Sequence, residues 1–327
     1  MRFFVLIAAL VLTGCAARFD LQGHRGARGL APENTLPAFE KALALGVTTL
    51  ELDTGITSDG VVVVMHDPWL NPDIVRGADG QWLAQRGPDI SQLTYEALSR
   101  YDVGRLKPGS TYAGGNPEQV PVDGTRVPRL AEVFALVRAS GNRTVRFNIE
   151  TKISPLAPGE TLPPEPFVRK VIDEIRKAGM ASRSTLQSFD WRTLQVAQRE
   201  APEIATVYLT AQQRFLDNVC TGVAAGNPNP KSAECAPSPW TAGFQLRDHG
   251  SVPRMVKAAG GAVWSPVYDD LDAAKLKEAK ALGLRVVVWT VNAPEQIARM
   301  LDLGVDGIIS DRPDLVLAEL KKRQPKT

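Results

Sequence analysis

Three acidic residues stand at the ends of two short stretches whose residues are typical of β-strands. Glu51 and Asp53 end "VTTLELD" (47–53), and Glu150 ends "TVRFNIE" (144–150). Residues two apart along a strand point to the same side, so Glu51 and Asp53 face the same way. Acids that converge on one spot repel each other unless a cation lies between them, and carboxylate oxygens suit a hard ion. The pattern predicts a site for one divalent cation, Ca²⁺ or Mg²⁺.

Structural salt bridges with Arg and Lys are the alternative use for these acids. For any single acid that use is the more common one, whereas three acids at the ends of consecutive expected strands favour the metal. Zinc fits less well, because the cysteines lie elsewhere in the chain and no H-E-x-x-H occurs.

Two of the three histidines lie in expected loops beside these strand ends. His24 follows the β-type stretch 18–22, and His66 follows the apolar run "VVVVM". A lone histidine after a strand is usually structural, but two beside one carboxylate cluster can form an acid/base pair, because imidazole titrates near neutral pH. His249 has no partner motif, and we expect it in a loop or at the surface.

Strand-like and helical stretches alternate along most of the chain. Five more strands are expected, at 184–188, 204–209, 261–266, 284–291 and 307–310. Amphipathic helical patterns lie between several of them, and three end in Gly just before the next strand, as C-caps do. This order predicts a (β/α)₈ TIM barrel, in which the residues at the carboxyl ends of the strands meet. A doubly wound open sheet is the alternative, but no G-x-G-x-x-G follows the first strand.

One domain, residues 15–327, accounts for this pattern, with an insertion of about 67–143 near the second strand. The insertion is rich in Gly, Pro and polar residues and holds one clear helical pattern, 129–139. A composition of 44% apolar and 23% charged residues is that of a globular protein. The formal charge of +2, with no basic run beyond a short tail, argues against a nucleic-acid partner.

The first 14 residues have the features of a secretion signal. Their apolar stretch is too short to span a bilayer comfortably, and it runs into Leu12-Thr13-Gly14-Cys15, which resembles a bacterial lipobox. Cleavage would then precede Cys15, which would become lipidated and anchor the chain to the membrane. Ala16 in the next position resembles outer-membrane sorting in Gram-negative cells, so we expect an anchored periplasmic lipoprotein. An ordinary signal peptide with an incidental cysteine is the alternative.

Two further cysteines, Cys220 and Cys235, flank a stretch rich in Gly, Pro and Asn. In an oxidising compartment such an even pair predicts a disulfide that closes the loop. Two buried free thiols are the alternative.

Seven motifs, in order along residues 21–318, resemble the glycerophosphodiester phosphodiesterase family. They are "HRGARGLAPENT" (24–35), "ELD" (51–53), "SDGVVVVMHDP" (58–68), "NIETK" (148–152), "QSF" (187–189), "WTVN" (289–292) and "GVDGIISDRP" (304–313). The resemblance implies a TIM-barrel enzyme that uses a divalent cation to hydrolyse glycerophosphodiesters to sn-glycerol 3-phosphate and an alcohol. By position it implies metal ligation by Glu51, Asp53 and Glu150, acid/base catalysis by His24 and His66, and phosphate contacts by Arg25 and Lys152.

Two further residues are expected at the mouth of the barrel. Gln187 is placed to contact phosphate or the sugar alcohol, and Trp289 to pack against the carbon face of glycerol or within the core.

Several reactions and one binding role fit this set of residues. Our hypothesis is a two-step route in which the substrate's own glycerol hydroxyl attacks phosphorus, and water then opens the cyclic phosphate; direct attack by water is the alternative. A lysophospholipase D-type reaction, a lyase that stops at the cyclic product and a non-catalytic binding lipoprotein are the rival functions. Either cation, any alcohol head group and any oligomeric state are compatible with the sequence.

Overall fold

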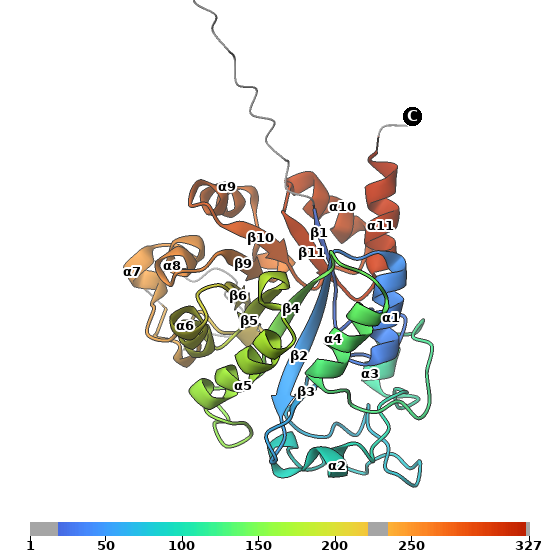
Figure 1. Ribbon diagram of the computed structural model, residues 1–327. Helices are drawn as coiled ribbons and strands as arrows, with labels where there is room; N and C mark the ends of the chain where they lie inside the picture. The colour runs from blue at the N-terminus through green and yellow to red at the C-terminus, as the bar shows by residue number, and fades with distance from the viewer. Residues whose placement is uncertain (1–18, 222–234, 325–327) are drawn as a thin grey trace, which may run out of the picture.

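Eight parallel strands close into a barrel in the computed structural model, which describes residues 19–221 and 235–324 (Figure 1). The strands are β1 (Asp20–Gly23), β2 (Thr49–Ile56), β4 (Arg146–Thr151), β5 (Ser184–Ser188), β6 (Ala205–Thr210), β9 (Val263–Pro266), β10 (Arg285–Val288) and β11 (Gly307–Ser310). β1 pairs with both β11 and β2, which closes the ring. The expected (β/α)₈ architecture is confirmed. The expected signal peptide, 1–14, and the lipidation site Cys15 lie outside the described residues.

Helices surround the barrel and connect most of its strands (Figure 1). They are α1 (Leu36–Leu45), α4 (Leu130–Ala139), α5 (Pro164–Lys177), α6 (Trp191–Glu200), α8 (Val252–Ala258), α9 (Ala273–Ala281), α10 (Pro294–Leu303) and α11 (Pro313–Lys322). The side chain of Thr35 caps α1, and Gly46 ends it with a φ of 83°, a left-handed conformation that glycine adopts without strain. None of the helices in the described ranges is long and apolar enough to cross a membrane.

The segment after β2 forms a small subsidiary structure beside the barrel. Its elements are β3 (Val62–Val64), the 3₁₀ turn η1 (Ile90–Gln92), α2 (Tyr95–Leu98) and α3 (Thr111–Gly114). It has an apolar cluster of its own, which includes Val63, Leu70, Ile90 and Leu98. Figure 1 places α4 between α1 and α5, in the ring of helices. The segment that leaves the ring of helices thus runs from β3 to the residue before α4, and the expected bounds of the insertion, about 67–143, stay a prediction.

A second excursion follows β6 on the same side of the barrel as the strand ends. The short hairpin of β7 (Gln212–Gln213) and β8 (Leu216–Asp217) precedes a disulfide between Cys220 and Cys235, whose Cα atoms lie 5.0 Å apart. The turn η4 (Pro239–Thr241) and α7 (Leu246–His249) follow, and the remaining 3₁₀ turns are η2 (Ala181–Arg183) and η5 (Tyr268–Asp270). The disulfide thus joins the hairpin to the chain that enters η4.

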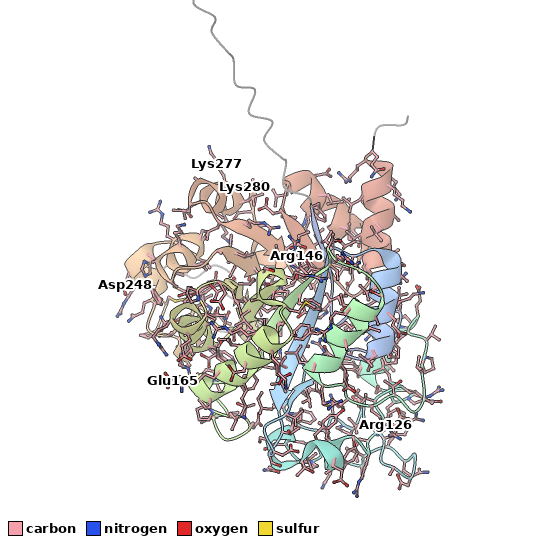
Figure 2. The ribbon with its side chains drawn as sticks, in the orientation of Figure 1. Arg126, Arg146, Glu165, Asp248, Lys277 and Lys280 are labelled. Atoms are coloured by element: carbon pink, nitrogen blue, oxygen red, sulfur yellow. A yellow bond between two sulfur atoms is a disulfide. The ribbon has the colours of Figure 1, made fainter. Side chains whose placement is uncertain are left out.

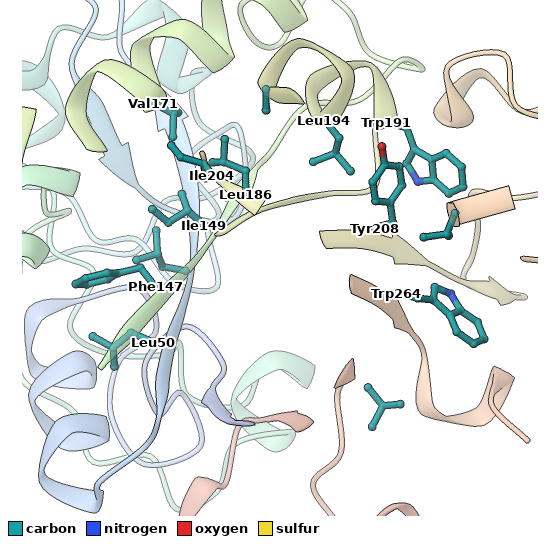
Figure 3. Close-up of a cluster of buried hydrophobic side chains, with 14 of the residues drawn as sticks. Leu50, Phe147, Ile149, Val171, Leu186, Trp191, Leu194, Ile204, Tyr208 and Trp264 are labelled. Atoms are coloured by element: carbon teal, nitrogen blue, oxygen red, sulfur yellow. The ribbon is translucent and has the colours of Figure 1, made fainter. Parts of the chain in front are cut away.

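The main apolar core lies between the strands and the helices that surround them. Figure 3 shows strand residues such as Phe147 and Ile149 with helix residues such as Val171 and Leu194. Charged side chains such as Lys277 are exposed on the outside (Figure 2). Burial of this apolar layer is the main stabilising contribution to the barrel.

Replacement of Phe147 tests how much this apolar core contributes to the stability of the fold. Phe147 is fully buried and packs edge-on against Phe134, with ring centroids 4.9 Å apart. Phe147→Ala should lower the free energy of unfolding by about 3–5 kcal/mol, because the cavity left behind cannot be filled. Urea denaturation measures the change, with Phe215→Ala as the control, since Phe215 is 72% exposed. Equal stability losses in the two variants would contradict this account.

Candidate functional site

The three acids expected to bind a metal lie together at the mouth of the barrel. Leu50 and Leu52 belong to the apolar core, so the intervening Glu51 and the following Asp53 point the other way, into the barrel. The β2–β4 register sets Asp53 beside Glu150. All three acids are at most 5% exposed, and one carboxylate oxygen of each lies within 4.8 Å of the others. The alternation of side chains along β2 and the pairing register of β2 with β4 therefore bring the three acids together.

Hydrogen bonds from neighbouring loops and strands fix the orientation of these acids. The backbone N–H of Arg25 donates to Oε2 of Glu51 at 2.8 Å, and Nδ2 of Asn34 donates to Oδ2 of Asp53 at 2.8 Å. Lys152 Nζ donates to Oε1 of Glu150 at 3.0 Å. The first β–α loop therefore braces two of the acids directly.

Burial and mutual repulsion oppose the ionised forms of two of the acids. Burial, together with the charge on Asp53, raises the pKa of Glu51 well above its usual value. Burial also raises the pKa of Glu150 to about 7, despite the nearby Lys152. Asp53 differs, since His66, Arg25 and Lys152 outweigh its burial and hold its pKa below the ordinary range. A divalent cation would stabilise all three carboxylates, so the donor set fits a hard, oxygen-liganded ion.

Each histidine of the expected acid/base pair has an aspartate partner at Nδ1. The His24 Nδ1–Asp311 Oδ1 distance is 2.5 Å, and the His66 Nδ1–Asp67 Oδ1 distance is 2.8 Å. A carboxylate that accepts from Nδ1–H fixes the ring orientation and leaves Nε2 to exchange a proton with a ligand. Burial lowers the pKa of His24, and burial with the charges of Arg25 and Lys152 lowers that of His66 to about 4. Both imidazoles are therefore neutral near pH 7 in the ligand-free protein.

The aspartate partners were missed by the sequence analysis. Asp67 directly follows His66 and is part of the quoted "HDP" stretch. Asp311 is 287 residues from His24 and reaches it only because the barrel closes β11 against β1. In the sequence, Asp311 was visible only as part of the motif "SDRP" at the end of the last strand. That motif does not indicate that Asp311 contacts His24.

The two cationic residues expected to hold phosphate line the same cavity as the acids. Arg25 is 7% exposed, and its guanidinium lies 3.3 Å from Asp53 and 2.8 Å from Glu33. The Lys152 ammonium lies 5.5 Å from the centre of the Phe189 ring. The cavity thus places two positive groups, each paired with carboxylates, beside the acidic cluster.

Gln187 and Trp289 also line the cavity, each with a protein partner. Gln187 donates through Nε2 to Oε1 of Glu51 at 2.6 Å and accepts from Asn148 at 2.7 Å. This hydrogen bond orients Glu51, and the expected contact of Gln187 with phosphate or the sugar alcohol stays a prediction. Trp289 donates through Nε1 to the backbone oxygen of Ser265, and its role as a surface for glycerol stays a prediction.

The cavity has a volume of about 510 Å³ and two chemically different halves. The ends of β1, β2, β3 and β4, with the loops that follow them, supply its titratable groups. The side formed by β5 to β11 and the second excursion is mostly apolar, lined by Phe189, Leu209, Leu216, Trp240, Trp289 and Ile309. Such a cavity suits a ligand with an anionic end and a less polar end.

Comparison with known families identifies the class of protein. Residues 24–315 match the model of the glycerophosphoryl diester phosphodiesterase family. The chain belongs to this family. Membership of the glycerophosphodiester phosphodiesterases confirms the class of enzyme that the seven motifs indicated.

Relatives and solved structures are similar to this chain over most of its length. A glycerophosphodiester phosphodiesterase of Caldanaerobacter subterraneus subsp. tengcongensis is 26% identical over 300 residues, which cover 91% of this chain and 96% of the relative. Human lysophospholipase D GDPD1 is 25% identical over 89% of this chain and 82% of its own. A crystal structure from Silicibacter pomeroyi DSS-3, described as a candidate glycerophosphoryl diester phosphodiesterase, superposes with a TM-score of 0.80 at 33% identity, covering 94% of each chain. An Oleispira antarctica phosphodiesterase in complex with the product sn-glycerol-3-phosphate shares the fold, with a TM-score of 0.64 at 20% identity over 92% of this chain and 96% of that one.

Metal binding to the acidic cluster should be visible as thermal stabilisation. Ca²⁺ or Mg²⁺ at about 100 times its Kd should stabilise the fold by ~2.7 kcal/mol and raise Tm by about 5 °C. Asp53→Asn should abolish this shift, as measured by differential scanning fluorimetry. Glu160→Gln is the matched control, because Glu160 lines the same cavity but pairs with Arg86. A shift that survives in Asp53→Asn would exclude the cluster as the metal site.

Proposed function

We propose that this protein hydrolyses glycerophosphodiesters to sn-glycerol 3-phosphate and an alcohol with the help of one divalent cation, Ca²⁺ or Mg²⁺. The single observation that carries the proposal is the juxtaposition, at one cavity, of a cluster of three buried carboxylates, two of which line the cavity, with two aspartate-paired histidines and two cationic side chains. The named activities of the relatives and the product complex of the Oleispira enzyme support the same reaction class.

Charge complementarity explains how this site would favour the reaction. Glu51, Asp53 and Glu150 would hold the cation, which supplies positive charge to oppose the negative charge that grows on the phosphate oxygens. Arg25 and Lys152 would bind those oxygens and orient the phosphodiester. In the charged half of a cavity with limited access to water, these interactions are stronger than they would be in bulk solvent.

Proton transfer is assigned to the two histidines. One imidazole Nε2 accepts the proton of the attacking hydroxyl, and the other imidazolium donates a proton to the departing alkoxide. Burial keeps both imidazoles in the neutral form that can accept a proton, whereas a bound phosphate anion beside them raises the pKa of either ring and favours the donor form. Asp311 and Asp67 would stabilise the imidazolium that forms on each side.

The attacking group is, in this proposal, the glycerol hydroxyl next to the phosphate ester. Its oxygen forms a bond to phosphorus as the bond to the alcohol oxygen breaks, giving a five-membered cyclic phosphate and the free alcohol. Water then adds to phosphorus and opens the ring to sn-glycerol 3-phosphate. Direct attack by water would give the same products without the cyclic species.

An assay of the mature chain with glycerophosphocholine tests the proposal. We expect sn-glycerol 3-phosphate to be released with Ca²⁺ or Mg²⁺ and not with EDTA. His24→Ala should lower kcat by about 10²–10⁴-fold, because a general acid or base is lost. The control is His249→Ala, which alters the histidine outside this cavity and should leave kcat unchanged. ³¹P NMR of the reaction measures both outcomes.

Two results of this assay would count against the proposal. Turnover that is indifferent to EDTA and to Glu51→Ala would remove the metal assignment. Absence of a cyclic glycerol phosphate signal at early times, with normal turnover, would favour direct attack by water.

Release of the head group from a lysophospholipid is a second candidate function. The apolar half of the cavity favours it, since that half offers a surface to an acyl chain. Lysophosphatidylcholine in the same assay separates the two, because the first proposal expects turnover of glycerophosphocholine in preference.

We also propose that the chain is a lipoprotein anchored through Cys15 to the outer membrane of a Gram-negative-type cell, with the barrel in the periplasm. The lipobox-like sequence supports this location, and so does the Cys220–Cys235 disulfide, because disulfides persist in oxidising compartments.

Replacement of the lipidation cysteine should release the protein from membranes. When the full chain is expressed in a Gram-negative host, Cys15→Ser should move it from the membrane fraction because the acyl chains are not attached. The matched control Ala17→Ser should stay in the membrane fraction, as followed by immunoblotting of separated fractions. Membrane retention of Cys15→Ser in high salt would contradict lipid anchoring.

A further inference from the structure

Part of the insertion lies directly against the loop that carries His24 and Arg25. We call residues 111–120 the strap. Within it, the Gln119 side chain donates to the backbone oxygen of Arg28 at 2.7 Å, and the Val120 N–H donates to the backbone oxygen of Leu30 at 3.0 Å. Glu118 pairs with Arg312, next to the aspartate partner of His24, at 3.0 Å. The strap is therefore attached to the site loop at several points.

Tyr112 is the strap residue that reaches furthest toward the site. Its hydroxyl donates to Oε2 of Glu33 at 2.5 Å and accepts from Nη1 of Arg25 at 3.0 Å. The Arg28 guanidinium lies over its ring, 5.0 Å from the ring centre. Tyr112 thus contacts the guanidinium that we expect to hold a phosphate oxygen, although the insertion provides none of the acids or histidines of the central cluster except His66 and Asp67.

The geometry around Arg25 allows its side chain little freedom. Nη1 binds Glu33 at 2.8 Å and the Tyr112 hydroxyl at 3.0 Å, while Nε faces Asp53 at 3.3 Å. Glu33 is ionised, because Arg25 and Arg28 outweigh its burial and hold its pKa below the usual value. The hydroxyl of Tyr112 therefore closes a ring of hydrogen bonds with one carboxylate and one guanidinium.

We propose that Tyr112 is a positioning residue, through which the strap holds the Arg25 guanidinium in the orientation that binds the phosphate group of the substrate. The inference rests on the proposed function, in which Arg25 contacts phosphate. Without the hydroxyl, Nη1 of Arg25 loses a partner and Glu33 loses a donor, so the guanidinium can turn away from the cavity. The insertion would then tune phosphate affinity without contacting the substrate.

A second tyrosine in the insertion provides a matched control. The Tyr95 hydroxyl donates to Oε2 of Glu132 at 3.2 Å, and the Arg129 guanidinium lies 5.3 Å from the centre of its ring. This arrangement of tyrosine, glutamate and arginine resembles that of Tyr112, but its partners belong to the start of α4. Neither Arg129 nor Glu132 lines the 510 Å³ cavity, whereas Arg25, the partner of Tyr112, does. Loss of the Tyr95 hydroxyl should therefore report only structural effects.

The experiment compares Tyr112→Phe and Tyr95→Phe in the full mature chain. Both variants keep the ring and lose one hydroxyl. For Tyr112→Phe we expect the Kd for sn-glycerol 3-phosphate, measured by calorimetry with saturating Ca²⁺ or Mg²⁺, to rise about ten-fold, the scale of one charge-assisted hydrogen bond. KM for glycerophosphocholine should rise with it more than kcat falls. Tyr95→Phe should change neither quantity, even if its Tm falls as much as that of Tyr112→Phe.

The possible outcomes separate the inference from the proposed function. A Kd in Tyr112→Phe equal to that of the wild type, when the wild type binds and turns over substrate, would overturn the positioning role alone. A wild-type protein that neither binds sn-glycerol 3-phosphate nor turns over glycerophosphocholine would overturn the proposed function and the inference together. Equal losses of affinity in both variants would show a general effect of the insertion on stability and would also overturn the specific role of Tyr112.

Discussion

The burial of three carboxylates at one point is the constraint on which the site depends. Glu51, Asp53 and Glu150 cannot all ionise there without compensation, and the surrounding residues serve largely to supply it. Lys152 and Arg25 bring positive charge, while Gln187 and a backbone N–H donate to Glu51. A site compensated only in part by protein groups is well suited to a divalent cation, because the cation completes the compensation when it binds.

Local patterns in the sequence were sufficient to predict the barrel and this cluster. Alternation along a strand, helical periodicity and glycine C-caps are short-range signals, and the strands they indicate are those of the structure. The clustering of the acids follows from them, because parallel strands in a barrel all end on one face. The expected insertion of about 67–143 includes α4, which Figure 1 places in the ring of helices, and its bounds stay a prediction.

Contacts that depend on barrel closure or on the path of the insertion could not be predicted. Asp311 meets His24 only through the pairing of the last strand with the first, and Tyr112 meets Arg25 only because the strap folds back over the first loop. Gln187 was expected to contact the substrate because of its position at a strand end, which does not reveal its hydrogen bond to Glu51. The spacing of residues along the sequence thus identified which polar side chains lie at the mouth of the barrel. Which of them already bond to other protein groups depends on tertiary contacts.

The place where β1 begins has a consequence for the orientation of the molecule at a membrane. Asp20 starts β1 at the end of the barrel where α11 finishes, and the strands run from there toward the end where α2 lies (Figure 1). Only four residues, 16–19, separate Asp20 from Cys15, so the two Cα atoms lie at most about 18 Å apart. If Cys15 is lipidated, as we propose, the end of the barrel where β1 begins would lie toward the bilayer and the mouth would face the aqueous compartment. Diffusible phosphodiesters would then reach the acids directly, whereas a lipid still embedded in the same membrane would first have to leave it.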